Sequence, residues 1–345
     1  MTPFAVLLLS LTITTLPPTP LIETTKSGQA LNFDFLLENT TGEKLELTEV
    51  EASVLGADGT LILQRRLGGN GASIATLPQR ELDPGAKMVV FNPFAELESD
   101  IPLQTIRYDF NFDDKHRTSI TVKPQLYALR ANLILPVPGR VFVHDGHDFY
   151  SHHRRLDITG GMTTALGIRT NMTRYAYDFT VVDDKGNMHR GDGMKNQDWP
   201  SFGAPVVAPA DGVVVKAATD RPDGTKAQRA PLDREAVMKN VLEIMGNFAV
   251  IDHGHGEFSV LAHMKQGSVT VKPGDRVKQG QKLGEIGCSG DAMFPHLHYQ
   301  LQRDDYLGEG LPSYFRDYQR FTGTAWVPVK RGQVDTGDIV RSTVK

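Results

Sequence analysis

Two histidines separated by a single residue give the first indication of chemistry in this sequence. His296 and His298 lie in the segment FPHLHYQL (294–301). In a β-strand, residues i and i+2 point to the same face, so the two imidazoles would lie side by side while Leu297 faces the other way. Such a pair can bind a metal through one ring and move protons through the other. Two solvated histidines on a half-exposed strand would have the same spacing. The surrounding sequence therefore has to distinguish a metal site from a pair of surface histidines.

The composition restricts the ligands that the chain can offer to a metal. Cys288 is the single cysteine, which excludes an internal disulfide and a four-cysteine zinc site. Of the eleven histidines, His116 alone precedes residue 144. Imidazole and carboxylate are therefore the available ligands, and both suit zinc. The formal net charge of −4 and the lack of a strongly basic run argue against a nucleic acid as partner.

The segments around the histidine pair form an ordered set that is more specific than any one of them. Asp178 lies in a strand-like run, His263 lies near the end of another, and a glycine-rich stretch leads to the pair. In chain order the segments are YAYDF (175–179), GAPVVAPADGVVV (203–215), LAHM (261–264), VKPGDRVKQGQKLGEIG (271–287) and His296-Leu297-His298. Over roughly residues 140–305 this set resembles the LytM/lysostaphin-type zinc metallopeptidases, peptidase family M23.

The resemblance implies a Zn²⁺ cofactor and a role for each matched residue. Asp178 and His298 would be zinc ligands, and His263 and His296 would be catalytic. It also implies a compact antiparallel β-sheet with the zinc in a groove, and a peptide crosslink of the bacterial cell wall as substrate. Catalytic zinc sites use three protein ligands and leave one position open for water, whose pKa the metal lowers to about 7.

The third ligand is where the chain departs from the family. The family's usual His-x-x-x-Asp motif would place a histidine four residues before Asp178, but this position holds Arg174, which cannot coordinate zinc. Some members of the family have a segment similar to YAYDF at this place and take the histidine from a segment further upstream. Here that segment is DGHDFYSHHRRLD (145–157), which indicates His153 and leaves His152 as an alternative. Asp157 also has the family spacing from His153, but Asp178 and not Asp157 leads into the GAPVVAPADGVVV segment.

The elements that must position these residues are predicted to be mainly β-strands. Residues 23–125 read as an N-terminal antiparallel β-sandwich of Ig-like type, with a hairpin at Asp58-Gly59. Residues 126–140 read as a linker, and residues 141–310 as the M23-type antiparallel β-sheet domain, followed by a C-terminal extension at 311–345. Strands are expected at Tyr177–Val182, Pro205–Val215, Phe248–Asp252, Phe258–Ala262, Val269–Val271 and His298–Leu301. Between Ala217 and Gly246, Val237, Val241, Leu242 and Met245 share one helical face and predict a short helical insertion.

The first residues favour export. An apolar run from Phe4 to about Leu16 resembles the core of a secretory signal peptide, which would occupy residues 1–22. The run is too short for a comfortable membrane span, so no stable span is expected after signal cleavage. An apolar first strand of the mature protein is the alternative.

Together these features predict an exported, periplasmic or extracellular zinc endopeptidase that hydrolyses peptide crosslinks of peptidoglycan. Arg174 motivates a different class of function, a non-catalytic homologue that binds the wall or activates a partner hydrolase. A peptidase for soluble peptides or proteins is a third hypothesis, because the N-terminal sandwich is not a recognisable wall-binding repeat. The scissile bond is left open between glycyl-glycine bridges and crosslinks of D-amino acids.

Overall fold

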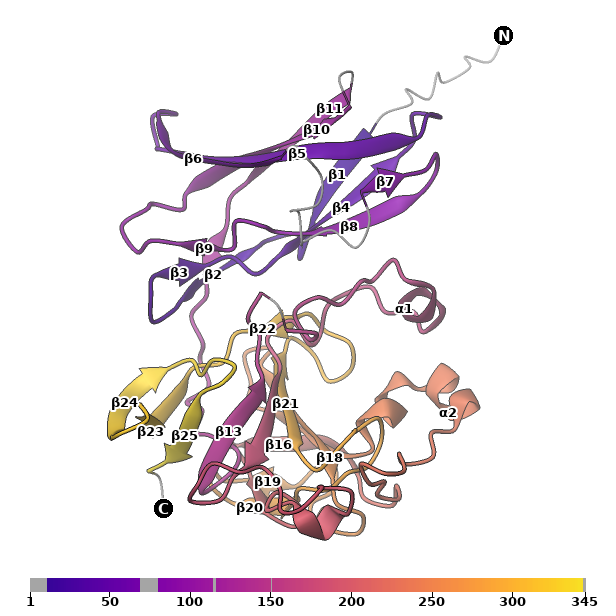
Figure 1. The fold of residues 1–345 in the computed structure, drawn as a ribbon, viewed down its shortest axis with the longest axis vertical. Coiled ribbons are helices and arrows are strands. Elements are labelled where there is room, and N and C mark those ends of the chain that lie inside the picture. The colour runs from indigo at the N-terminus through magenta and orange to yellow at the C-terminus, as the bar shows by residue number, and fades with distance from the viewer. Residues whose placement is uncertain (1–10, 69–79, 114–115, 150, 344–345) are drawn as a thin grey trace. The chain divides into compact units, whose positions relative to one another are not determined.

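The structure is a computed structural model that describes residues 11–68, 80–113, 116–149 and 151–343 (Figure 1). It divides into two compact units: residues 1–127 with 157–160, and residues 128–156 with 161–345. The prediction of a mainly β chain, with a sandwich followed by an antiparallel-sheet domain that carries a short helical insertion, is confirmed. Within these described ranges, none of the helices is both long and apolar enough to cross a lipid bilayer.

The first unit holds its core between two antiparallel sheets, ordered β1-β4-β8 and β11-β10-β5-β6, with β7 beside β5. Aromatic side chains from both sheets meet there, and the rings of Phe35 and Tyr108 lie 4.8 Å apart. A small sheet, β12-β2-β3-β9, completes the unit. The strands are β1 (Leu11–Leu16), β2 (Leu21–Thr24), β3 (Gln29–Ala30), β4 (Asp34–Asn39), β5 (Leu45–Leu55), β6 (Leu61–Gly68), β7 (Glu81–Leu82), β8 (Lys87–Phe91), β9 (Glu96–Leu97), β10 (Thr105–Phe112), β11 (His116–Val122) and β12 (Gln125–Leu126).

Local sequence explains the hairpin formed by β5 and β6. β5 and β6 pair antiparallel from Glu49 opposite Gly68 to Leu55 opposite Leu61. The chain reverses at Asp58-Gly59, where Gly59 adopts φ +83°. Asp58 accepts hydrogen bonds from the backbone and hydroxyl of Thr60, which fixes the turn. The hairpin predicted at this dipeptide is confirmed, because glycine accepts a positive φ at little cost.

The predicted signal peptide, residues 1–22, falls in part on residues 1–10, which lie outside the described residues. Within the remainder, Leu11–Leu16 forms β1 and pairs with Asp34–Asn39 of β4 along its whole length. Leu21–Thr24 forms β2. Signal cleavage and export stay predictions.

The second unit is built around one large antiparallel sheet, ordered β19-β16-β17-β18-β21-β14-β13-β25-β23-β24, with β22 beside β21 and a separate β15-β20 pair. Its strands are β13 (Arg140–Asp145), β14 (Tyr177–Val181), β15 (Pro205–Val207), β16 (Gly212–Ala218), β17 (Asn247–Asp252), β18 (Phe258–Met264), β19 (Arg276–Val277), β20 (Lys282–Glu285), β21 (Leu297–Gln302), β22 (Gly310–Leu311), β23 (Phe315–Phe321), β24 (Trp326–Gly332) and β25 (Ile339–Ser342). Its helices are α1 (Gly161–Ala165), α2 (Arg234–Lys239), and the 3₁₀ turns η1 (Asn196–Asp198) and η2 (Val241–Met245).

Three predicted elements differ in the structure. The strand expected at Pro205–Val215 is two strands, β15 and β16, separated by a turn at 208–211. The strand expected at Val269–Val271 is wrong, because this segment makes single hydrogen bonds to Thr219 and Leu283 and joins no ladder. The helical insertion is divided at Asn240, whose extended backbone ends α2 and whose side chain caps η2.

The segments expected to flank the second domain are part of it. Leu133, Ile134 and Leu135 lie in the predicted linker, and all three are buried. The amides of Arg130 and Ala131, also in that linker, donate to the Glu257 carboxylate. Residues 311–345, predicted as an extension, supply β23–β25 to the large sheet.

Candidate metal centre

The register of four neighbouring strands places the predicted site residues in one row. Asp178 of β14 lies opposite His298 of β21. On the other side of β21, His298 lies opposite Ala262 of β18, and His263 follows. Asp145, the last residue of β13, lies opposite Asp178. Antiparallel pairing therefore brings together residues that are as much as 153 positions apart in the sequence, counting from Asp145 to His298.

Alternation along β21 orients His298, whereas His296 lies just before the strand. Leu297, Tyr299 and Leu301 are fully buried and lie on the opposite face of β21 from His298. The other face carries His298, Gln300 and Gln302. The amide of Gln300 donates to the Gln302 side chain, which in turn donates to the carbonyls of Asp304 and Tyr306. This ladder of amides satisfies the polar groups of a strand that is buried on both faces.

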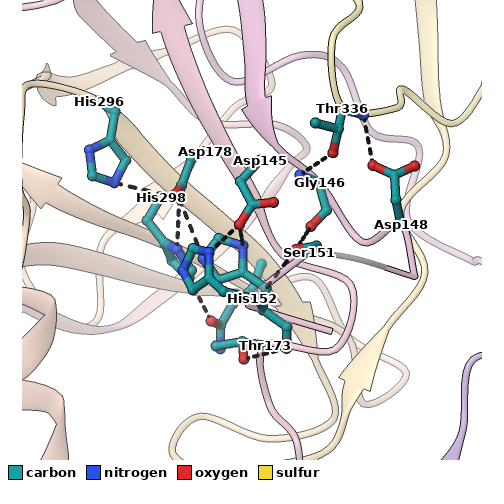
Figure 2. Close-up of polar contacts among 12 residues, drawn as sticks. Asp145, Gly146, Asp148, Ser151, His152, Thr173, Asp178, His296, His298 and Thr336 are labelled. Atoms are coloured by element: carbon teal, nitrogen blue, oxygen red, sulfur yellow. Dashed lines mark hydrogen bonds and ion pairs between the residues drawn. The ribbon is translucent and has the colours of Figure 1, made fainter. Parts of the chain in front are cut away.

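The Oδ1 atom of Asp178 is the point on which three imidazoles converge (Figure 2). It lies 3.1 Å from Nδ1 of His298, 3.5 Å from Nε2 of His296 and 3.6 Å from Nε2 of His153. The ring of His263 lies 4.9 Å from that of His296 and 5.8 Å from that of His298. All five residues that the sequence predicted for the site are thus brought together.

These separations suit a small tetrahedral ion. Two ligand atoms that bind one zinc at about 2.0–2.1 Å with tetrahedral angles are separated by roughly 3.3 Å. The three distances from Asp178 Oδ1, 3.1, 3.5 and 3.6 Å, lie on either side of this value. The donor set of imidazole and carboxylate fits zinc. Distance alone does not separate His296 from the proposed ligands, and its assignment as catalytic rests on the resemblance.

Hydrogen bonds at the far side of each ring fix which nitrogen faces the site. Nδ1 of His263 donates to the carbonyl of Ser289 at 2.9 Å, and Nδ1 of His296 donates to that of Phe294 at 2.8 Å. Nε2 of His298 donates to the Gln300 side chain at 2.8 Å. A neutral imidazole carries one N–H, so the nitrogen that remains in each ring has a free lone pair. A metal site orders its histidines in this way.

Burial and charge set protonation states that a metal requires. Burial raises the pKa of Asp178, but interactions with the neighbouring imidazoles of His153, His296 and His298 outweigh burial and hold that pKa well below its usual range. Burial lowers the pKa of His153 to about 3. It also lowers the pKa of His263 and His296. Neutral imidazoles therefore face an ionised carboxylate at neutral pH, which is the state that binds a cation.

His152 and His153 are separated by the structure, although they are adjacent in the sequence. The His153 side chain is buried and faces Asp178, whereas that of His152 is 72% exposed. Both histidines approach Oδ2 of Asp145 through Nδ1. The Nδ1 atom of His152 makes a hydrogen bond to this oxygen, whereas the Nδ1 atom of His153 lies 3.5 Å from it. Asp145, His152, His153 and Asp178 form a cluster of metal-binding type.

The sequence interpretation missed Asp145. The neighbours of Asp145 make other contacts: His144 packs on Phe294, His147 packs on Tyr175 and Tyr177, and Asp148 accepts from the amide of Thr336. The signal that could have found Asp145 is the antiparallel pairing of 140–145 with YAYDF. This pairing places the carboxylate at the end of one strand opposite Asp178.

Arg174, in place of the family's usual histidine, does not face the metal centre. Its side chain is fully buried and pairs with the Glu309 carboxylate through Nε. The same carboxylate accepts from the amide of Asn171, whose side chain donates to the carbonyls of His153 and Arg154. The segment before β14 therefore anchors the loop that carries His153.

The site residues lie at the floor of a cavity of about 1450 Å³. His153, Asp178, His263, His296 and His298 all line it. Two further histidines, His253 and His255, are not part of the cavity lining. Both ring nitrogens of His253 make hydrogen bonds, to the carbonyl of Asp211 and to the hydroxyl of Ser259, and His255 is exposed. A cleft with convergent polar groups and perturbed titratable residues is the usual setting of an active site.

Comparison with known proteins gives matches in this unit. Residues 193–307 match the model of peptidase family M23, a range that contains His263, His296 and His298 but not Asp178 or His153. The cell division protein DipM of Caulobacter vibrioides is 30% identical over 118 residues, 34% of this chain and 15% of DipM. The peptidoglycan DD-endopeptidase ShyA of Vibrio cholerae is 36% identical over 69 residues, 20% of this chain and 16% of ShyA. The chain thus spans less than a fifth of these relatives' length.

Among solved structures, the catalytic domain of the prophage-encoded M23 protein EnpA from Enterococcus faecalis, in a mutant form, is 19% identical, with a TM-score of 0.26. That match covers 40% of this chain and 73% of the EnpA domain. Residues 193–307 of the chain are thus similar to peptidase family M23.

Proposed function

We propose that the chain is an exported zinc endopeptidase that hydrolyses peptide crosslinks of the bacterial cell wall. The observation that carries the proposal is the convergence of three imidazole nitrogens on Asp178 Oδ1, at 3.1–3.6 Å. A bound Zn²⁺ supplies a Lewis acid that polarises a peptide carbonyl and lowers the pKa of water to about 7. His153 through Nε2, His298 through Nδ1 and the Asp178 carboxylate would hold it.

His263 and His296 would act on the substrate and on protons. Each ring is held by a backbone carbonyl at Nδ1, so each Nε2 is left without its own proton. Such a nitrogen can take a proton from an attacking water and return it to the leaving amine. The protonated rings would also stabilise the negative charge that develops on the scissile carbonyl oxygen. His263 has φ +60°, an uncommon value for a non-glycine residue and typical of residues held in place at functional sites.

Asp145 would orient His153. A histidine that binds a metal through one nitrogen usually donates the other N–H to a carboxylate or carbonyl, which fixes the ring and increases its basicity. Oδ2 of Asp145 faces Nδ1 of His153, opposite the nitrogen that faces Asp178. His152 shares this carboxylate from the exposed side. The assignment of His153, and not His152, as the third ligand is supported by its burial and its position.

The choice of substrate is supported by the names of the relatives, since ShyA and ShyC of Vibrio cholerae are both described as peptidoglycan DD-endopeptidases. Export is proposed because such a substrate lies outside the cytoplasmic membrane. The alternative is a non-catalytic wall-binding or hydrolase-activating protein, and Arg174 motivates it. His153 weakens this argument, because its imidazole nitrogen can replace the ligand that the family's histidine would supply.

The test is zinc content together with turnover. The full chain, His298→Ala and a control, His255→Asn, would be analysed by plasma mass spectrometry and incubated with purified peptidoglycan. Asparagine suits the positive φ of His255, which is exposed. About one zinc per chain and release of soluble muropeptides, both lost in His298→Ala and retained in the control, are expected. Zinc without turnover on any wall preparation would favour the non-catalytic alternative, and no zinc would overturn the proposal.

A further inference from the structure

A break in the pairing of β13 with β14 gives the cavity one histidine that the proposed mechanism does not use. Val143 lies opposite Phe179, and the next pair joins Asp145 to Asp178. His144 is therefore an extra residue on β13. Two residues of one strand that oppose a single residue of its partner form a β-bulge. Bulges are over-represented next to active sites, where they re-aim a side chain.

The bulge lets two consecutive side chains reach the same cavity. Neighbouring residues of a regular strand point to opposite faces, so a regular β13 could present His144 or Asp145 to the cavity, but not both. Both residues line it. Val143, by contrast, is fully buried and is not part of the lining. The irregular pairing therefore adds a second side chain, the His144 imidazole, to the part of the cavity that β13 supplies.

The His144 ring packs on aromatic neighbours and has polar atoms that are free to bind a ligand. The ring lies 4.8 Å from that of Phe294 and 6.2 Å from that of Phe142. Within the described ranges of the chain, neither of its nitrogens makes a hydrogen bond or an ion pair with another residue. The side chain is half-buried in the cavity lining. Because an imidazole carries at least one N–H in every protonation state, His144 offers the cavity a hydrogen-bond donor.

His144 lies close to a residue that is proposed to act on the substrate. The Phe294 ring, on which His144 packs, also contacts the ring of His296, at 4.9 Å. The rings of His144 and His296 are therefore at most about 10 Å apart. An extended peptide advances at most about 3.6 Å per residue. A peptide whose scissile bond lies at His296 thus reaches His144 within about three residues.

We propose that His144 binds the substrate, through a hydrogen bond from its imidazole to a main-chain carbonyl within about three residues of the scissile bond. The inference rests on the proposed peptidase function and adds a residue to it. Glycyl bridges and crosslinks of D-amino acids both offer such a carbonyl. Because the donor is partly open to solvent in the free chain, the bond replaces a contact with water and changes the affinity by a small factor, not by orders of magnitude.

The test is the effect of two substitutions on the kinetics of the full, zinc-loaded chain. His144→Phe keeps a ring against Phe294 and removes the donor, whereas His144→Gln keeps a donor. The substrate is a mixture of crosslinked muropeptides that a muramidase releases from purified peptidoglycan. His144→Phe should raise KM about three- to tenfold at unchanged kcat, because the bond is made equally in the ground state and the transition state. His144→Gln should stay within about twofold of the native KM, because its amide donates as well.

Controls separate substrate binding from folding and from the metal. His116→Phe makes the same change at a half-buried histidine of β11, in the other unit, and should leave KM unchanged. The zinc content and unfolding temperature of His144→Phe should match those of the native chain. An unchanged KM in His144→Phe, an equal loss in His144→Gln, or loss of zinc from His144→Phe would overturn the inference.

A binding measurement separates this inference from the proposed function. His263→Asn removes a proposed catalytic imidazole and suits the positive φ of that residue. In this background the affinity for the muropeptides is read without turnover, and it should fall by the same factor when His144→Phe is added. Absence of turnover in the native chain would count against the proposed function. The role of His144 would be refuted by an affinity that is absent, or that His144→Phe leaves unchanged.

Discussion

Asp145 offers the sharpest test of how His153, the proposed third ligand, is held, through the substitution Asp145→Asn. The change keeps the size of the side chain and removes its negative charge. In the native chain, Oδ2 of Asp145 lies 3.5 Å from Nδ1 of His153, on the side of the ring away from Asp178. Burial raises the pKa of Asp145, but the hydrogen bond from His152 and the charge of His153 outweigh it and keep the group ionised.

The size of the effect follows from this geometry. Loss of a partner that orients a metal-binding histidine typically costs about 10–100-fold in metal affinity. Each factor of ten corresponds to about 1.4 kcal/mol. The 3.5 Å contact is longer than a good hydrogen bond, so the effect should lie at the lower end of the range. We expect Asp145→Asn to weaken zinc binding about tenfold, or about 1.4 kcal/mol.

The assay is competition for zinc between the purified chain and a chromophoric chelator, with circular dichroism as the check on folding. His153→Ala should retain no stoichiometric zinc, whereas His152→Ala should bind within about threefold of the native chain because its side chain is exposed. His255→Asn is the control for loss of a histidine elsewhere. If His152→Ala were as damaging as His153→Ala, the assignment of the third ligand would be wrong. Native affinity in Asp145→Asn would refute the orienting role alone.

Three further predictions follow from buried polar groups. Arg174→His should break the buried pair with Glu309 and lower the free energy of unfolding, measured by urea denaturation, by about 3–5 kcal/mol. The new histidine should not become a metal ligand, so an increased zinc affinity would contradict this prediction. Gln300→Leu removes the acceptor for the His298 Nε2–H and should weaken zinc binding about tenfold in the chelator assay, whereas unchanged affinity would show that the amide does not orient the ring. Burial raises the pKa of Cys288 to about 12, so its thiol stays protonated at pH 8. Cys288 should therefore react with Ellman's reagent only after unfolding, and a rapid reaction of the native chain would contradict its burial.

Prediction from the sequence worked best where the pattern itself carries the geometry. The two-residue period of β21 places His298 on the face opposite Leu297, and the turn at Asp58-Gly59 depends on four residues. It failed where neighbours decide the outcome. Val269–Val271 has β-branched residues at its ends but makes only isolated hydrogen bonds, because no strand pairs with it along its length.

The candidate site shows the same division. The resemblance indicated His153, because Arg174 cannot coordinate a metal and some members of the family take this histidine from an upstream segment. Nothing in the local sequence distinguishes His152 from His153, since both are adjacent on a polar loop. Burial separates them, and burial depends on Asn171, which binds the carbonyl of His153 from a different segment. Asp145 was missed for the same reason, because its role depends on the pairing of β13 with β14.

The sequence by itself determined the class of fold and the resemblance to the family, because these depend on residue type, order and a two-residue period that any strand obeys. The tertiary structure alone decided which carboxylate faces His153, that Arg174 is buried against Glu309, and that His153 is buried while His152 is exposed. The physical reason is that these contacts join residues far apart in the chain. Their geometry is set by strand register and packing, which no local pattern encodes.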